Sequence, residues 1–72
     1  MIIQTFGIVL RELRVQNKLS QEKLAELCDL DRTYISLLER GLRQPTISTI
    51  FVVASALQIK PSEFISLVES KL

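Results

Sequence analysis

The chain has 72 residues, 47% of them hydrophobic, which is enough for one small domain with a single core. One cysteine and no histidine exclude an internal disulfide and leave no plausible zinc or iron site. The lack of histidine also removes the commonest general base, so we expect no enzyme, and the net charge of +1 is below that of many nucleic-acid binders. We expect no metal, no other cofactor and no small-molecule ligand.

The first ten residues, MIIQTFGIVL, are apolar but have no basic start and no small-residue cleavage site. The stretch is also too short and too interrupted to span a bilayer. We therefore expect a cytoplasmic protein that does not enter a membrane.

A first amphipathic helix is predicted from about Thr5 to Gln16. Four apolar residues recur there at the spacing i, i+3, i+4, i+7 of one helix face: Phe6, Val9, Leu10 and Leu13. Gly7 is an early weak point in this helix, and Asn17 is a suitable left-handed exit residue.

Residues 21–40 predict two short helices folded against each other. Ser20 caps the first by accepting from an orphan amide, and that helix ends near Cys28. Asp31 is the next natural cap, so the following helix begins at Arg32, continues to about Arg40 and stops at Gly41. The apolar residues of the two helices form a shared core: Leu24, Ala25, Cys28, Leu30, Ile35 and Leu38. This pattern predicts a helix-turn-helix.

Two more helices complete the chain. Thr46 caps a fourth helix, whose buried stripe is Ile50, Val53, Ala54 and Leu57. Pro61 fits the first position of a fifth, whose inner face is Phe64, Leu67 and Val68. No strand signal, repeat or low-complexity segment is present. The expected fold class is all-α, with five short helices in one domain over residues 1–72.

The chain resembles the lambda-repressor-like helix-turn-helix family, also called the XRE class. The resemblance rests on four motifs in order: LSQEKLA (19–25), ISLLERG (35–41), the PT start at 45–46 and ALQIKPSEF (56–64). Within that family, DRTYIS (31–36) is most similar to small controller proteins of restriction-modification systems. The resemblance implies DNA binding through the helix-turn-helix. Asp29 departs from the family pattern, because it stands where the family often has glycine.

In such proteins the third helix lies in the major groove with its N-terminal residues against base edges. Arg32 has the planar fork that matches guanine O6 and N7. Thr33 can donate, accept or touch a thymine methyl, and Ser36 shares the same helix face. Leu37 either contacts thymine or lies at the edge of the core.

Phosphate contacts are predicted for residues around this helix. The resemblance gives Gln21, at the start of the second helix, a role in clamping the DNA backbone. Arg43 and Gln44, in the loop after the third helix, are placed to flank the groove. Tyr34 either reaches a phosphate or base or lies over the protein surface, and we predict a DNA contact.

Two further groups have structural roles. The resemblance aligns Arg14 and Glu39 with a pair that joins the first and third helices, so we expect a partly buried salt bridge. Surplus apolar residues indicate a dimer interface made by helices four and five, about residues 46–70: Phe51, Val52, Ile65 and Leu72. Such a dimer sets two recognition helices roughly 34 Å apart. The alternative is that Phe51 and Val52 pack under the fifth helix.

The leading functional hypothesis is a sequence-specific transcriptional regulator that binds double-stranded DNA as a homodimer on an inverted-repeat operator. The alternative is a protein-interaction module, such as an antitoxin-type regulator paired with a partner protein.

Overall fold

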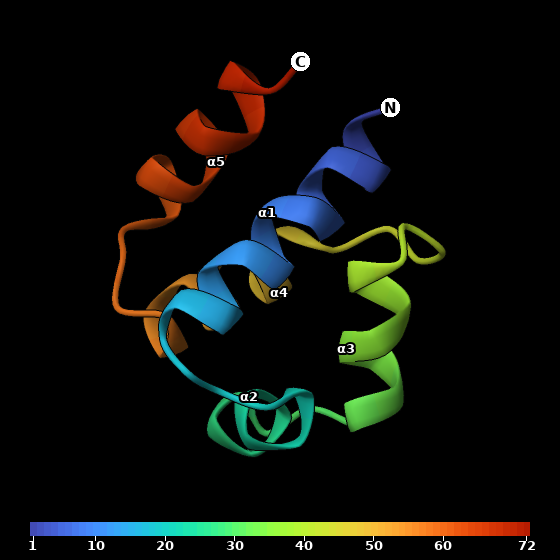
Figure 1. Cartoon of the computed structure of the whole chain (residues 1–72), viewed down its shortest axis with the longest axis vertical. Helices are drawn as coiled ribbons and strands as arrows, with labels where there is room; N and C mark the ends of the chain where they lie inside the picture. The colour runs from blue at the N-terminus through green and yellow to red at the C-terminus, as the bar shows by residue number, and fades with distance from the viewer.

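The computed structural model describes residues 1–72 and contains five helices and no strand, which confirms the all-α prediction. They are α1 (Ile2–Gln16), α2 (Gln21–Cys28), α3 (Arg32–Glu39), α4 (Ile47–Ala56) and α5 (Pro61–Ser70). Helix α1 crosses the middle of the molecule and packs against α3 and α5, while α2 contacts α3 and α4 (Figure 1). The two chain ends lie at the same end of the molecule (Figure 1).

All five helices contribute to one hydrophobic core. Its largest fully buried side chains are Phe64, Leu10, Leu24, Ile35, Leu38 and Leu57. The rings of Phe6 and Phe64, whose centroids are 4.9 Å apart, join α1 to α5. The prediction that Leu67 belongs to the inner face is wrong, because this side chain remains 42% exposed. Helix α5 packs mainly on α1 and α4, so the narrow stripe of Phe64 and Val68 is enough to cover that contact.

The first helix starts earlier than predicted. It begins at Ile2 rather than near Thr5, because both the amide and the hydroxyl of Thr5 donate to the carbonyl oxygen of Met1, at 2.9 and 2.8 Å. Gly7 does not interrupt it. The left-handed residue after the helix is Lys18, with φ of 58°, and not Asn17, whose side chain instead donates back to the carbonyl of Leu13 at 2.8 Å.

At two of the three predicted N-caps, the side chain accepts a hydrogen bond from an amide in the first turn of the helix. Ser20 and Thr46 accept hydrogen bonds from the amides of Lys23 and Thr49, at 2.9 and 3.1 Å. Asp31 is the N-cap of α3 as predicted, but its side chain makes no capping bond, and its carbonyl oxygen accepts from the first turn of the helix.

No single helix is long and apolar enough to cross a membrane. Helices α4 and α5 together have the length and hydropathy of a span, but they lie at 102° to each other. Their inward residues, including Val53 and Phe64, belong to the core.

Candidate nucleic-acid interface

The turn between α2 and α3 is made by residues that allow a sharp change of direction. Asp29 adopts the left-handed conformation with φ of 55°, which an aspartate tolerates better than most side chains. The amide of Leu30 then donates to the carbonyl of Ala25 at 2.9 Å and closes the turn. Ala25, Cys28, Ile35 and other buried residues lie beneath it. The geometry that the family usually obtains with glycine is therefore retained.

The first turn of α3 presents polar side chains to solvent, and its other face is buried. Arg32 and Thr33 are exposed, whereas Ile35 is fully buried. Ser36 and Leu37 are half-buried, so their side chains lie at the border between the exposed face and the core. The structure thus places the four residues predicted to read bases on one side of the same short helix, Arg32 and Thr33 in its first turn and Ser36 and Leu37 in its second.

Tyr34 lies over the protein and is tied to α4. Its hydroxyl is 3.1 Å from Oγ1 of Thr49, which is itself 3.0 Å from Oγ1 of Thr46. The guanidinium carbon of Arg43 lies 5.9 Å from the centre of the Tyr34 ring, within cation–π range. The unbound protein therefore adopts the alternative that the sequence left open, in which Tyr34 packs on the protein surface.

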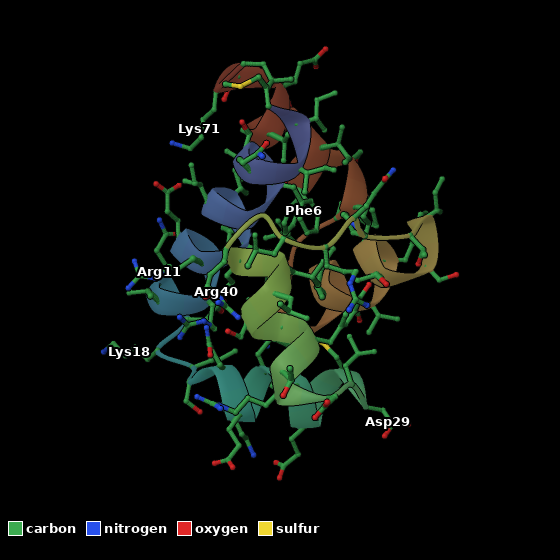
Figure 2. All side chains as sticks on the ribbon, turned by 90° about the vertical axis from the view of Figure 1, so that its right-hand side faces the viewer. Phe6, Arg11, Lys18, Asp29, Arg40 and Lys71 are labelled. Carbon is green, nitrogen blue, oxygen red and sulfur yellow. The ribbon has the colours of Figure 1, made fainter.

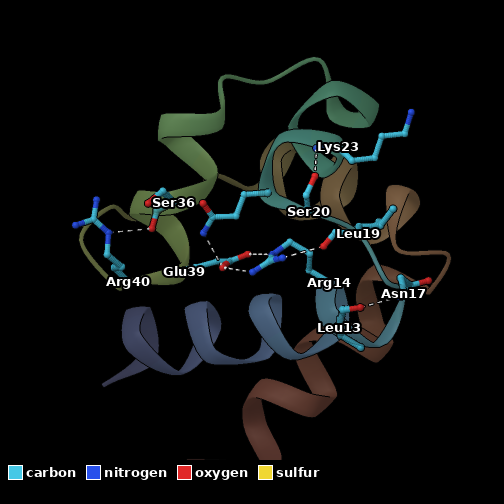
Figure 3. A network of polar contacts seen from close by, with 10 residues as sticks. Leu13, Arg14, Asn17, Leu19, Ser20, Lys23, Ser36, Glu39 and Arg40 are labelled. Atoms are coloured by element: carbon cyan, nitrogen blue, oxygen red, sulfur yellow. Dashed lines mark hydrogen bonds and ion pairs between the residues drawn. The ribbon is translucent and has the colours of Figure 1, made fainter.

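A buried polar network anchors the carboxyl end of α3. Arg14 Nε and Nη2 donate to the two carboxylate oxygens of Glu39 at 2.6 and 3.1 Å (Figure 3). Arg14 Nη1 also donates to the carbonyl of Leu19 at 2.8 Å, and Gln21 Nε2 donates to Glu39 Oε1 at 3.0 Å. The expected pair is present, with only 11% of the arginine and 2% of the glutamate side chain exposed.

The network changes what Gln21 can offer to DNA. One hydrogen of its side-chain nitrogen is donated to Glu39, so the groups left for DNA are the second hydrogen of that nitrogen, the amide oxygen and the backbone N–H at the start of α2. The backbone N–H of Gln21, at the N-terminus of α2, is the group best placed to bind an anion. Sequence reasoning missed this third partner of the salt bridge. Arg43 and Gln44 are exposed in the loop after α3, as a phosphate contact requires.

The four residues predicted for dimerisation are all substantially exposed: Phe51 60%, Val52 39%, Ile65 45% and Leu72 60%. Phe51 and Ile65 line a groove of about 520 Å³ between α4 and α5, together with Ile47, Ile50 and Pro61. Leu72 does not line it. A second groove on the other side of Phe51 is bordered by Val52 and by Leu27 of α2. Ile47, 74% exposed, and Leu27 were missed, although Ile47 lies one helical turn before Phe51 and could have been found by that spacing.

Three other ionisable residues, Lys23, Glu26 and Cys28, have shifted pKa values with structural causes. Lys23 and Glu26 form an exposed ion pair of 2.8 Å; the hydrogen bond and the opposite charge raise the pKa of Lys23 and lower that of Glu26. Burial raises the pKa of the Cys28 thiol, so this residue is an inert core side chain at neutral pH. The structure has no group of three or more His, Cys, Asp or Glu side chains that could hold a metal ion.

The fold and the exposed first turn of α3 define a helix-turn-helix DNA-binding protein. The family described as helix-turn-helix matches residues 10–64, and the chain belongs to it. The control protein C.BamHI of Bacillus amyloliquefaciens is 43% identical over 61 residues, which are 83% of this chain and 75% of that protein. The protein is a transcription regulator similar to restriction-modification controller proteins.

Solved structures agree with this assignment. The restriction-modification controller protein C.AhdI from Aeromonas hydrophila is 47% identical, with a TM-score of 0.84 over 86% of this chain and 94% of that chain. C.Esp1396I, solved as a tetramer in complex with its natural 35 base-pair operator, has a TM-score of 0.90 at 28% identity and covers 99% of this chain and 93% of that chain. These relatives support DNA-binding regulation rather than the antitoxin-type alternative.

Proposed function

We propose that this regulator binds an inverted-repeat operator as a homodimer, with α3 of each protomer in the major groove. The observation that carries the proposal is the division of α3 into an exposed start and a buried face that holds the helix on the domain. Arg32 and Thr33 are exposed, while Ile35, Leu38 and Glu39 hold the helix on the domain. Recognition helices of this class contact base edges with their N-terminal residues, and these are the residues that α3 leaves free.

Each polar residue then has a defined role. Arg32 donates to a guanine through its fork, and Thr33 and Ser36 read neighbouring bases from the same face. Leu37, at the border of the core, contacts a thymine methyl at the edge of the interface.

Phosphate contacts position the helix in the groove. The backbone N–H of Gln21 binds a phosphate at the N-terminus of α2, and Arg43 and Gln44 bind the backbone from the loop after α3. We also propose a backbone contact for Tyr34, because its hydroxyl can donate its proton to a phosphate when the Thr49 hydroxyl is the donor of the bond between them.

Dimerisation places two copies of α3 on one face of the DNA. The groove between α4 and α5 supports this proposal, because Phe51, Ile65 and Ile47 leave apolar surface exposed there. A two-fold axis along this groove would bring Phe51 of each protomer against the apolar wall of the other. Val52 and Leu72 extend the interface at its margins.

The similarity to control proteins supports a further assignment, in which the protein regulates the genes of a restriction-modification system. Its role is to bind rather than to catalyse. A regulator of this kind acts in the compartment that holds the DNA, which in bacteria is the cytoplasm.

Site selection from random duplex DNA tests the proposal. The unaltered protein is expected to select a symmetric motif, and Arg32→Ala is expected to lose preference for one guanine in each half-site by about tenfold or more. Lys71→Ala is the matched control, because Lys71 directly follows α5 and pairs with Glu12 of α1, away from α3, and should leave the motif unchanged. Failure to select any motif at low salt, where phosphate contacts are strongest, would overturn sequence-specific binding.

A further inference from the structure

Gly7 lies in the middle of a helix, where glycine is normally unfavourable relative to alanine. It is buried, and it faces the carboxyl end of α3. A Cβ atom at this position would overlap the carbonyl oxygen of Leu38 and lie 2.7 Å from that of Glu39. All the nearest atoms belong to the backbone of α3, so none of them can turn aside as a side chain would.

A second glycine, just after the end of α3, lies similarly close to α1. Gly41 follows the helix with φ of 71°, and a Cβ there would lie 3.0 Å from both Cα and Cγ of Gln4 on α1. Gly7 and Gly41 therefore allow α1 and the end of α3 to touch backbone to backbone. We refer to these two residues and the atoms they contact as the glycine joint.

The glycine joint lies next to the buried network. Glu39 supplies one carbonyl oxygen to the joint and its carboxylate to Arg14. Gly7 and Arg14 are seven residues apart, which places them two turns apart on the same face of α1. The end of α3 is thus fixed to α1 at two levels, by a close backbone contact and by an ion pair.

We propose that Gly7 is a positioning residue for DNA recognition, whose missing side chain sets the angle of α3 against α1 and thereby the approach of Arg32, Thr33 and Ser36 to the bases. This inference rests on the proposed function. An added methyl group must push α3 away by at least about 0.7 Å to bring the Glu39 carbonyl from 2.7 Å to the ordinary 3.4 Å, and somewhat further to clear the closer Leu38 carbonyl. Across a helix about 12 Å long, a shift of that size at one end is a tilt of a few degrees.

The tilt matters because the other end of α3 is held separately. The hydrogen bond from Leu30 to Ala25 fixes the turn before α3, so movement at the joint rotates the helix about its start. The first turn would then meet the bases at a changed angle. In a dimer, both copies would be tilted in the same way, so the change in each protomer acts twice on the fit to the operator.

The test compares Gly7→Ala with Val9→Ala. Val9 lies on the same helix, is 1% exposed and borders α5 with Leu67, so shortening it should destabilise the fold without pushing α3. Residual dipolar couplings of the free variants measure the angle between α1 and α3. Competition binding measures affinity for the selected operator, for operators with single base changes and for random duplex DNA.

Gly7→Ala is expected to change the interhelical angle and to weaken operator binding about tenfold, equivalent to spoiling one good base contact. Binding to random DNA should change less than threefold, and Val9→Ala should keep both the angle and the operator preference. A changed angle with unchanged base preference would overturn the inference, as would an unchanged angle. If Gly7→Ala does not fold, Gly41→Ala decides in its place by the same measurements.

Failure of the proposed function has a different signature. In that case the unaltered protein itself would show no operator preference, while Gly7→Ala would still change the angle between α1 and α3. That result would overturn the assignment of α3 as the reading helix, and with it the role of Gly7 in recognition.

Discussion

Glu39 is a buried charged residue that holds the end of α3 in place. Its carboxylate is 98% removed from solvent and accepts from Arg14 and Gln21. No buried side-chain nitrogen or oxygen in the protein lacks a hydrogen-bond partner. An arrangement of this kind is sensitive to the loss of one member, because the charge that remains cannot return to water.

Glu39→Ala is therefore expected to lower the free energy of unfolding by about 3 kcal/mol or more, since it leaves the Arg14 guanidinium buried without its partner. Chemical denaturation followed by circular dichroism measures the change. Glu26→Ala is the control, because it removes an exposed ion pair and should have a far smaller effect. An unchanged melting temperature together with an altered operator preference would show that Glu39 acts on DNA recognition directly.

The residues of this network also show how far sequence reasoning extends at this scale. The Arg14–Glu39 pair was expected from family resemblance, but the hydrogen bond from Gln21 was not. That bond depends on how the start of α2 faces the end of α3, and no local pattern encodes this relation. The same holds for Tyr34, whose hydroxyl meets Thr49 across a loop.

At the scale of elements, the pattern of apolar residues was a good guide to the helices and a poorer guide to their ends. Repeats at i, i+3, i+4 and i+7 report one buried face, and α1 buries the face that they predict. The start of α1 and the face of Leu67 could not be found this way, because each depends on which neighbours the helix meets. Gly7 was expected to weaken α1, whereas the structure uses it for close contact with α3.

Helices α4 and α5 leave an apolar face that the core does not use. Phe51→Glu is expected to shift the protein from dimer to monomer, because it places a charge at the centre of the groove between these helices. Analytical ultracentrifugation across a range of concentrations measures the change in dimer dissociation constant, expected to be about a hundredfold if Phe51 is an interface hot spot.

Ile8→Glu is the matched control for that variant. Ile8 is 50% exposed on α1 and does not line either groove beside Phe51, so the dimer constant should be unaffected. Equal weakening by both substitutions would indicate a general effect of added negative charge. An unchanged dimer with Phe51→Glu would move the interface away from α4 and α5.

The whole molecule has a small net charge. Arg11, Lys18 and Arg40 lie along one side of the molecule, with Asp29 toward the other (Figure 2). A net charge of +1 gives little general attraction to a phosphate backbone. Under the proposed function, binding therefore depends on a few placed contacts that are repeated in the second protomer of the dimer.

This dependence predicts a measurable change in salt sensitivity when one placed contact is removed. Arg43→Ala takes away one cation from each protomer, so the slope of log K against log salt for the dimer should become shallower by about 2. The loss of affinity should be similar for every operator variant, because a phosphate contact carries no sequence information. Lys71→Ala removes the same formal charge from the residue after α5, which pairs with Glu12 of α1, and it should leave the slope unchanged. If Arg43→Ala also left the slope unchanged, its guanidinium would be a support for the Tyr34 ring rather than a phosphate contact.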